Sequence, residues 1–260
     1  MSELDQHRSL NHSLNAFSEA LKSGRFVRMR RLLASLHPAE TAHLLESLPP
    51  NERLVCWPII NPELRGEVLS YIGEDVRTGL MTGMDTADLL SATEDLDTDD
   101  VVDILQDLPG HVMQEVLRAM NSQRRRRIEA ILAYEEDTAG GLMNTDVVTV
   151  RSDITLEVVL RYLRKYGELP ENTDSLYVVD HQDKYLGTLR LSQVVSRSRS
   201  LTVREAMSHQ VDPIPANMSD HDVAHRFEKH DLISAPVVDK DNHLLGRITI
   251  DDVVDVIRDE

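Results

Sequence analysis

The sequence divides at Tyr134-Glu-Glu-Asp-Thr-Ala-Gly-Gly-Leu-Met143. Before this stretch, the apolar residues recur with a helical period and Leu-Pro pairs interrupt them. After it, short β-type runs such as Leu176-Tyr-Val-Val-Asp180 alternate with amphipathic helical patterns. Paired glycines adopt backbone angles that other residues resist, and they interrupt both helices and strands. We therefore interpret Gly140-Gly141 as a hinge between two different folds.

The composition is that of a folded, acidic chain. Its 260 residues predict one or two domains, and 41% apolar residues suffice for packed cores. The formal charge of −17 repels nucleic acid and attracts cations, although a solvated acidic surface is its commonest meaning. We expect no nucleic-acid partner.

The single cysteine, Cys56, permits no internal disulfide and is expected to be a small buried apolar residue. The N-terminus lacks a signal-peptide pattern, and no apolar run approaches the ~18–20 residues of a membrane span. These features predict a soluble, cytosolic chain.

The first half repeats a short helical unit. His37–Pro49 and Asp97–Pro109 share their form at an offset of sixty, with Leu44-Leu45 falling on Ile104-Leu105. Such recurrence predicts an α-superhelical N domain at residues 16–133 after a flexible N-terminus at 1–15, with an irregular bundle as the alternative. The basic run Arg124–Arg127 is interpreted as a solvated helix face.

The second half is a duplication. Met143–Val150 aligns with Met207–Ile214, and Asp180 and Asp239 are each followed seven residues later by glycine. Each copy reads as β-α-β-β-α, with the segments Asp180–Gly187 and Asp239–Gly246 as hairpin turns. We predict a multi-domain fold: the all-α domain, a hinge at 134–143, and an α/β tandem pair at 144–200 and 201–260.

This tandem resembles a pair of CBS domains, named after cystathionine β-synthase. The Tyr134–Met143 stretch, preceded by Leu-Pro helical repeats, makes residues 30–260 resemble the cytosolic part of MgtE-type bacterial magnesium channels. In that family a transmembrane pore follows the second CBS copy. The resemblance therefore implies that this chain is the soluble part of a longer protein, on the cytoplasmic side of the inner membrane.

Two helices carry acidic stripes. Asp99 and Asp103 are spaced i, i+4 and Asp107 continues their line, although acids at the start of that helix also fit capping. In the closing helix of the second copy, Asp252 and Asp255 are spaced i, i+3. The apolar residues Val253, Val254 and Ile257 of that helix are expected to pack inward.

The resemblance implies a set of Mg²⁺ ligands. On this sequence they fall on Asp99, Asp103, Asp252, Asp255, Asp231, Glu260 and the backbone carbonyl of Gly141. Two acidic positions of the family are occupied here by Ser219 and His221, which puts a metal site there in doubt.

A nucleotide is the second candidate ligand. Gly246-Arg-Ile-Thr-Ile-Asp-Asp252 fits the CBS pattern in which Thr249 and Asp252 hold ATP, whereas the first copy has Arg190 and Gln193 there. The histidines are scattered without a metalloprotease, zinc-ligand or nucleophile motif, so we expect no enzyme.

These observations lead to two hypotheses. In the first, Mg²⁺ bridges the acidic faces of the N domain and the CBS pair, compacts a homodimer formed through the CBS domains and closes the attached pore. Low Mg²⁺ then releases the N domain. In the second, the chain is a soluble adenine-nucleotide-binding adaptor whose helical domain recruits a protein.

Overall fold

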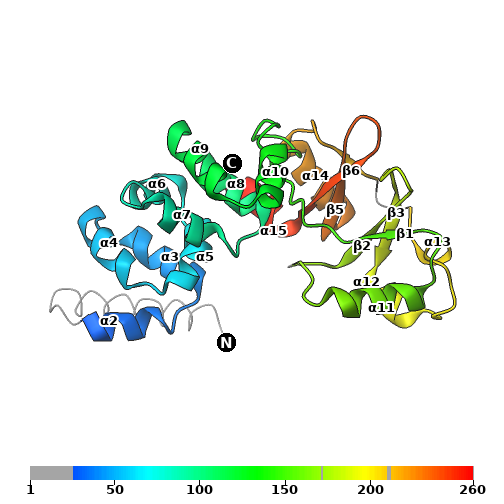
Figure 1. Ribbon diagram of the computed structural model, residues 1–260, viewed down its shortest axis with the longest axis horizontal. Helices are drawn as coiled ribbons and strands as arrows, with labels where there is room; N and C mark the ends of the chain where they lie inside the picture. Colours follow the sequence, from blue (N-terminus) through cyan, green and yellow to red (C-terminus); the bar gives the residue numbers. More distant parts are fainter. Residues whose placement is uncertain (1–25, 171, 210–211, 260) are drawn as a thin grey trace. The chain divides into compact units, whose positions relative to one another are not determined.

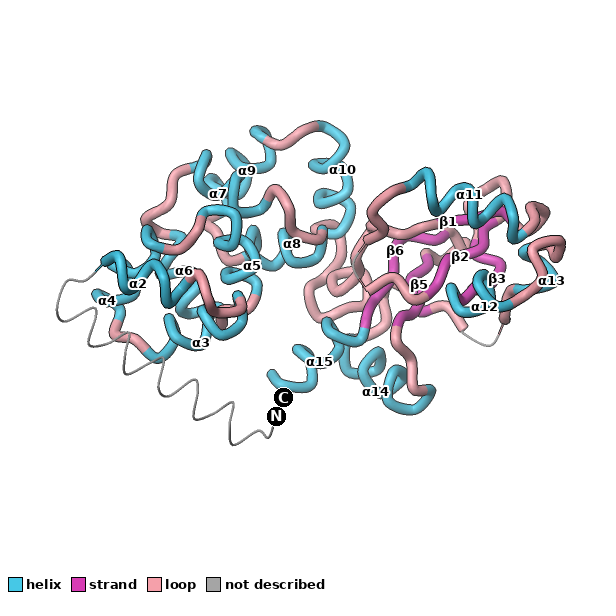
Figure 2. The backbone as a smooth tube through the Cα atoms, turned by 90° about the horizontal axis from the view of Figure 1, so that it is seen from below, coloured by secondary structure: helices cyan, strands magenta, loops and turns pink. Residues whose placement is uncertain are grey.

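The computed structural model describes residues 26–170, 172–209 and 212–259, and its chain forms two units. One unit contains the chain up to Leu96 together with Asp100–Arg125, and the other contains Asp97–Asp99 and Arg126–Glu260. Figure 1 follows the chain through them, and Figure 2 shows that the strands belong to the second unit alone. None of the helices described combines the length and the apolar character needed to cross a membrane.

The first unit is helical, which confirms the all-α prediction for this half. Its helices are α2 (Phe26–Leu33), α3 (Pro38–Ser47), α4 (Pro50–Cys56), α5 (Arg65–Ser70), α6 (Glu74–Met81), α7 (Thr86–Thr93), α8 (Thr98–Gln106), α9 (Gly110–Ala119) and α10 (Ser122–Ile131), with 3₁₀ turns at Trp57–Ile59 and Pro62–Leu64. Helices α8 and α10 each run from one unit into the other.

The predicted helical repeat is present. Helices α3 and α4 recur sixty residues later as α8 and α9, and each pair is joined at a Leu-Pro step. Leu44, Leu45, Ile104 and Leu105 are all buried, as their shared position in the repeat requires. The repeat therefore reflects a shared pattern of burial.

Cys56 is fully buried at the end of α4. Burial, and to a smaller extent the charge of Glu52, raises the pKa of its thiol to about 12. The thiol therefore stays protonated and behaves as the predicted apolar residue.

The interpretation of Arg124–Arg127 as a solvated face is wrong for Arg124. Its guanidinium donates to the carbonyls of Thr93, Glu94 and Leu96, the last at 2.9 Å, where α7 ends. The last carbonyls of a helix have no partner within the helix, and a guanidinium offers several donors in one plane. Arg124 therefore has a structural role: it binds the end of α7 to α10, although its partners lie about thirty residues earlier in the sequence.

The second unit contains two copies of one α/β fold, as predicted. The first comprises β1 (Thr149–Arg151), α11 (Leu156–Tyr166), β2 (Ser175–Val179), β3 (Tyr185–Arg190) and α12 (Leu191–Ser196). The second comprises β4 (Ile214–Pro215), α14 (Asp220–His230), β5 (Ser234–Val238), β6 (Leu244–Thr249) and α15 (Ile250–Asp259), and α13 (Val203–Ala206) precedes it. In each sheet the first strand is parallel to the second, which is antiparallel to the third.

The two copies exchange their leading segments. Asn144, ahead of the first copy, pairs with Arg247 of β6, and Ser208, ahead of the second, pairs with Thr188 of β3. Each pairing consists of two backbone hydrogen bonds of 2.8 and 2.9 Å. The approach is so close that a Cβ on Gly246 would lie 2.6 Å from the Asn144 carbonyl oxygen. This proximity, rather than the hairpin turn, explains the repeated glycine.

The prediction that Gly140-Gly141 adopts backbone angles that other residues resist is wrong. Neither glycine has a positive φ. A Cβ on Gly140 would instead strike the ring of Tyr134, and one on Gly141 would lie 2.5 Å from the Glu136 carbonyl oxygen. Ala139 and Gly140 also donate to the carbonyls of Met218 and Ala216 at 2.8 Å. The glycine pair is therefore packed inside the second unit and does not lie at a boundary between units.

The orientation predicted for α15 is also wrong in part. Val253 is buried, but Val254 and Ile257 are 45% and 52% exposed. Val253 shares its face with Thr249 one turn earlier, whereas Val254 continues a stripe that begins at Ile250. Apolar composition alone did not reveal which of these two stripes packs inside the unit.

Candidate metal and nucleotide sites

Helix α8 carries the first predicted group of acids. Its apolar residues Val101, Val102, Ile104 and Leu105 are buried, so the acids take the remaining faces. Asp103 is exposed and Asp99 is half-buried. A carboxylate on an exposed helix face retains access to ions, which suits Asp103 to metal binding.

Asp107 belongs to a different interaction. Its carboxylate accepts a hydrogen bond from Nε of Arg77 at 2.5 Å, and the two side chains are only 8% and 13% exposed. Removing one partner of such a buried pair leaves an uncompensated charge. Asp107 therefore joins α6 to the end of α8, and the predicted acidic stripe ends at Asp103.

Asp252 caps the helix that carries it. Its Oδ2 atom accepts hydrogen bonds from the backbone N–H and the hydroxyl of Thr249, both at 3.0 Å. Thr249 immediately precedes α15 and Asp252 is the third residue of the helix, so the bond from the Thr249 amide to Asp252 is one of the two hydrogen bonds of a capping box. The Thr249 hydroxyl also donates to the carboxylate of Asp251. The two predicted nucleotide residues are therefore hydrogen-bonded to each other, and one of them, Asp252, is also a predicted metal ligand.

Asp255 lies one turn further along α15. It is exposed and forms an ion pair with Arg258 across 3.1 Å, in which both side chains are 70% exposed. Such a surface pair contributes at most about 1 kcal/mol, so an ion could replace Arg258 at little cost.

Asp231 terminates α14 in the left-handed conformation, with φ 49° and ψ 47°. Aspartate is one of the few residues other than glycine that adopt this conformation readily, which gives Asp231 a local structural role. Ser234 of β5 pairs with Thr249 of β6, so Asp231 and Asp252 both lie near the same end of that strand pair. The fold thus brings these two predicted ligands to one edge of the second copy.

The remaining predicted positions are less defined. Gly141 is buried, and its amide donates to the Thr138 carbonyl at 2.9 Å. Ser219 caps α14 by accepting from the Asp222 amide, a role that an aspartate would also fill. Asp103 belongs to the first unit, whereas Asp99, Asp231, Asp252 and Asp255 belong to the second. Glu260 lies outside the described residues.

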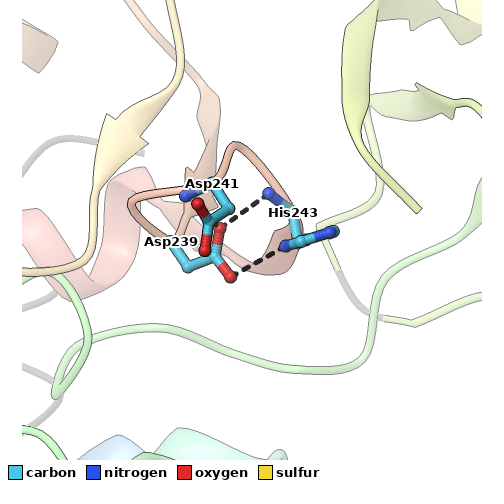
Figure 3. Close-up of side chains that lie close together, drawn as sticks. All are labelled: Asp239, Asp241 and His243. Carbon is cyan, nitrogen blue, oxygen red and sulfur yellow. Dashed lines mark hydrogen bonds and ion pairs between the residues drawn. The ribbon is translucent and has the colours of Figure 1, made fainter. Parts of the chain in front are cut away.

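One further group was missed by the sequence analysis. Asp239, Asp241 and His243 lie on the loop between β5 and β6, and Figure 3 shows their side chains converging. One ligand atom from each lies within 4.8 Å of the others. The available signal was the alternation Asp-x-Asp-x-His, which was interpreted only as a hairpin turn.

The chain matches two family models. The MgtE intracellular N domain matches residues 36–137, and the CBS domain matches residues 139–200 and 203–259. Among curated proteins, the magnesium transporter MgtE of Thermus thermophilus is 30% identical over 94% of this chain, and that of Enterococcus faecalis is 26% identical over 99%. The chain spans 55% and 57% of these relatives, respectively.

Two crystal structures are similar along nearly their whole length. The cytosolic domain of the Mg²⁺ channel MgtE in complex with ATP has a TM-score of 0.84 and 30% identity, covering 94% of this chain and 99% of that chain. The soluble part of a magnesium transporter has a TM-score of 0.80 and 25% identity, covering 96% and 98%. The similarity therefore extends over both units.

Proposed function

Because the chain belongs to the MgtE family of magnesium transporters, of which it forms the N domain and the tandem CBS domains, we propose that it is a Mg²⁺-sensing regulatory module. The observation that carries this proposal is the match of both units to the MgtE cytosolic domain. The family consists of transporters rather than enzymes, which confirms the expectation that the chain is not an enzyme.

The acids of the two units supply the physical basis. Two carboxylates about 4 Å apart repel by about 4 kcal/mol at an effective dielectric of 20. The acids of α8 and α15 therefore approach one another favourably only with cations between them. Mg²⁺ keeps several of its waters, so one or two carboxylates from each unit suffice. The proposed ligands remain Asp99, Asp103, Asp231, Asp252, Asp255, Glu260 and the Gly141 carbonyl.

Mg²⁺ would act by shifting a population. An ion that binds the docked arrangement more tightly than the released one favours docking by that difference in binding free energy. Gly140-Gly141 is held by hydrogen bonds from Ala139 and Gly140 to Met218 and Ala216, so we propose that the movement occurs in the part of 134–143 that precedes the glycines. The family models of the N domain and the first CBS domain meet there, at residues 137–139.

The whole protein extends the proposal. We propose that a transmembrane pore is connected to this chain on the cytoplasmic side of a bacterial inner membrane. The CBS domains would form a homodimer, docking at high Mg²⁺ would close the pore, and release at low Mg²⁺ would open it.

The experiment is small-angle scattering of the full chain across a Mg²⁺ titration. We expect the radius of gyration to decrease as Mg²⁺ rises, and the double variant D103N/D255N to need more Mg²⁺ for the same change. These residues are preferable to Asp252, whose replacement by alanine would also remove a helix cap worth about 1 kcal/mol.

D153N/E168Q provides the matched control, because it removes the same charge from two exposed acids outside the proposed site. An unchanged scattering profile over the titration would refute the proposal. An equal shift in the control would mean that only net charge matters.

ATP binding is a second candidate function, favoured by the similarity to a relative crystallised with ATP. We propose that Thr249 and Asp252 of the second copy contact the nucleotide. Their mutual hydrogen bonds would have to open or be shared, so ATP and Mg²⁺ would compete for Asp252. Calorimetry with ATP and the variant T249V tests this, and tight ATP binding without Mg²⁺-dependent compaction would favour the adaptor hypothesis.

A further inference from the structure

The loop between β5 and β6 carries a group of side chains that the proposed Mg²⁺ site does not use. Asp239 and His243 are partly buried and Asp241 is exposed. Together they offer two carboxylates and an imidazole, whose ligand atoms lie within 4.8 Å of one another. Figure 3 shows the three side chains on this loop. A mixed set of oxygen and nitrogen donors differs chemically from the purely acidic faces of α8 and α15.

Two of the three ligands are already held in position. The Oδ1 atom of Asp239 accepts hydrogen bonds from the backbone N–H groups of Asp241 and His243, both at 2.8 Å. This fixes the carboxylate so that Oδ2 lies 3.0 Å from Nδ1 of His243. Two ligands on adjacent corners of an octahedron, each about 2.1 Å from the metal, are also about 3 Å apart. The observed separation fits an ion shared between these two atoms, once the imidazole ring turns so that the Nδ1 lone pair faces the ion and not Oδ2.

The first copy shows that the fold does not require this combination. Asp180, the equivalent of Asp239, makes the same turn by accepting from the amides of Gln182 at 2.8 Å and Lys184 at 3.0 Å. Glutamine and lysine thus occupy the positions of Asp241 and His243 in a turn of the same geometry. The turn accounts for Asp239, but it accounts for neither the second carboxylate nor the imidazole.

We propose that Asp239, Asp241 and His243 form a binding site for a divalent transition-metal ion of the class that prefers imidazole, such as Zn²⁺ or Co²⁺. Asp239 contributes Oδ2, Asp241 a carboxylate oxygen and His243 the neutral Nδ1 atom, and water completes the coordination. The ion replaces the hydrogen bond between Asp239 and His243. Mg²⁺ is a poor competitor because it prefers oxygen ligands.

The position of the loop gives the site a structural consequence. His243 pairs with Lys184 of the first copy, and the Leu244 amide donates to the Asp183 carbonyl at 3.0 Å. An ion at this loop would therefore stiffen the contact between the two hairpins of the CBS pair. This inference is independent of the Mg²⁺ sites, because none of the three ligands is shared with them.

The test is titration of the full chain with Co²⁺ in excess Mg²⁺, followed by calorimetry and by visible absorption, which responds to the coordination number and ligand set of the bound ion. The decisive variant is D241Q/H243K, which gives the second hairpin the residues of the first and so preserves the turn. We expect the variant to lose the tightest equivalent of Co²⁺, with affinity at this site falling at least about 100-fold. Zn²⁺ should compete with Co²⁺ for the same equivalent.

A reciprocal variant controls for Co²⁺ binding at other histidines of the chain. Q182D/K184H places the three ligand types on the first hairpin and is expected to add one equivalent of Co²⁺. If D241Q/H243K folds poorly, the near-isosteric D241N/H243Q replaces it. Unchanged Co²⁺ stoichiometry and affinity in the ligand-removing variant would overturn the proposal, as would displacement of Co²⁺ by Mg²⁺ at comparable concentration.

Discussion

The two CBS copies have the same strand order, the same exchange of leading segments and the same Asp-centred turn, yet they differ in the residues that could bind ligands. Where the second copy has Thr249 and Asp252, the first has Arg190 and Gln193. Where the second has Asp241 and His243, the first has Gln182 and Lys184. Residues that both copies keep are those the fold uses. The candidate ligands are concentrated in the second copy.

The caps of the closing helices show the difference most directly. In α15, Asp252 satisfies the amide and hydroxyl of Thr249, whereas Arg190 makes no side-chain hydrogen bond that caps α12. The Oε1 atom of Gln193 is buried without a hydrogen-bond partner among the described residues. The first copy thus tolerates a less complete cap, so the bond from Thr249 to Asp252 in the second copy is not a requirement of the fold itself.

The largest predicted effect concerns what the copies share. Gly246→Ala places a Cβ 2.6 Å from the Asn144 carbonyl oxygen, and Gly187→Ala places one 2.8 Å from that of Ser208. Because both obstacles are backbone atoms, we expect each variant to lower the free energy of unfolding by about 3 kcal/mol. The loss should be larger for Gly246. Urea denaturation followed by circular dichroism measures this.

Trp57, the single tryptophan, lies in the first unit and reports that unit separately by fluorescence. Its transition should not move in either variant. Gly79→Ala is the matched control, because a Cβ there meets nothing within 4 Å and alanine favours a helix by about 1 kcal/mol. Equal, small effects at Gly187 and Gly246 would contradict the explanation by close approach.

The second prediction separates the two caps. Asp252→Ala should lower the free energy of unfolding by about 1 kcal/mol, since the Thr249 amide loses its acceptor. Gln193→Ala should cost less than about 0.5 kcal/mol, because no hydrogen bond is removed. Asp252→Asn keeps an acceptor and should recover most of the loss. A cost for Gln193→Ala equal to that of Asp252→Ala would abolish the distinction between the copies.

Local sequence patterns predicted the fold well, because buried apolar residues recur at regular spacing within each helix, strand and repeat. The alternation of strand and helix periods was enough to predict both β-α-β-β-α copies, and the sixty-residue repeat predicted α3 with α8. The errors involve partners distant in sequence. Arg124 binds carbonyls of residues 93–96, Asp107 pairs with Arg77, and Gly246 meets Asn144. No periodicity marks such contacts.

For the candidate sites, too, the sequence predicted local spacing but not contacts between distant residues. The i, i+4 spacing of Asp99 and Asp103 places them on one face, but whether they meet the acids of α15 depends on the arrangement of two units. The Asp239 group was missed for the opposite reason. Its members are close in sequence, but a turn explained them sufficiently, and only the comparison with Asp180 reveals the two residues that the turn does not need.

The smallest predicted effect concerns the two turn aspartates. Backbone hydrogen bonds from Lys184 and Gln182 hold the pKa of Asp180 below its usual 3.8. Burial alone would raise the pKa of Asp239, but hydrogen bonds from the His243 amide, the His243 ring and the Asp241 amide outweigh it, so that pKa is also lowered. For a lowered pKa, the stabilisation is present above the unfolded value and disappears as the pH falls through the folded one. Both turns should therefore weaken only below about pH 4.

The variant H243Q distinguishes the turn from the imidazole. Removing the ring should raise the pKa of Asp239 towards its ordinary value and leave that of Asp180 unchanged, because only the second copy uses a side-chain donor at this point. Carboxyl-detected NMR titration of both aspartates measures the two shifts in one sample. If the pKa of Asp239 did not move, the backbone turn alone would orient its carboxylate. The ring of His243 would then have no effect on Asp239 in the absence of metal. The two hairpins would differ in sequence but not in how they hold their turn aspartates.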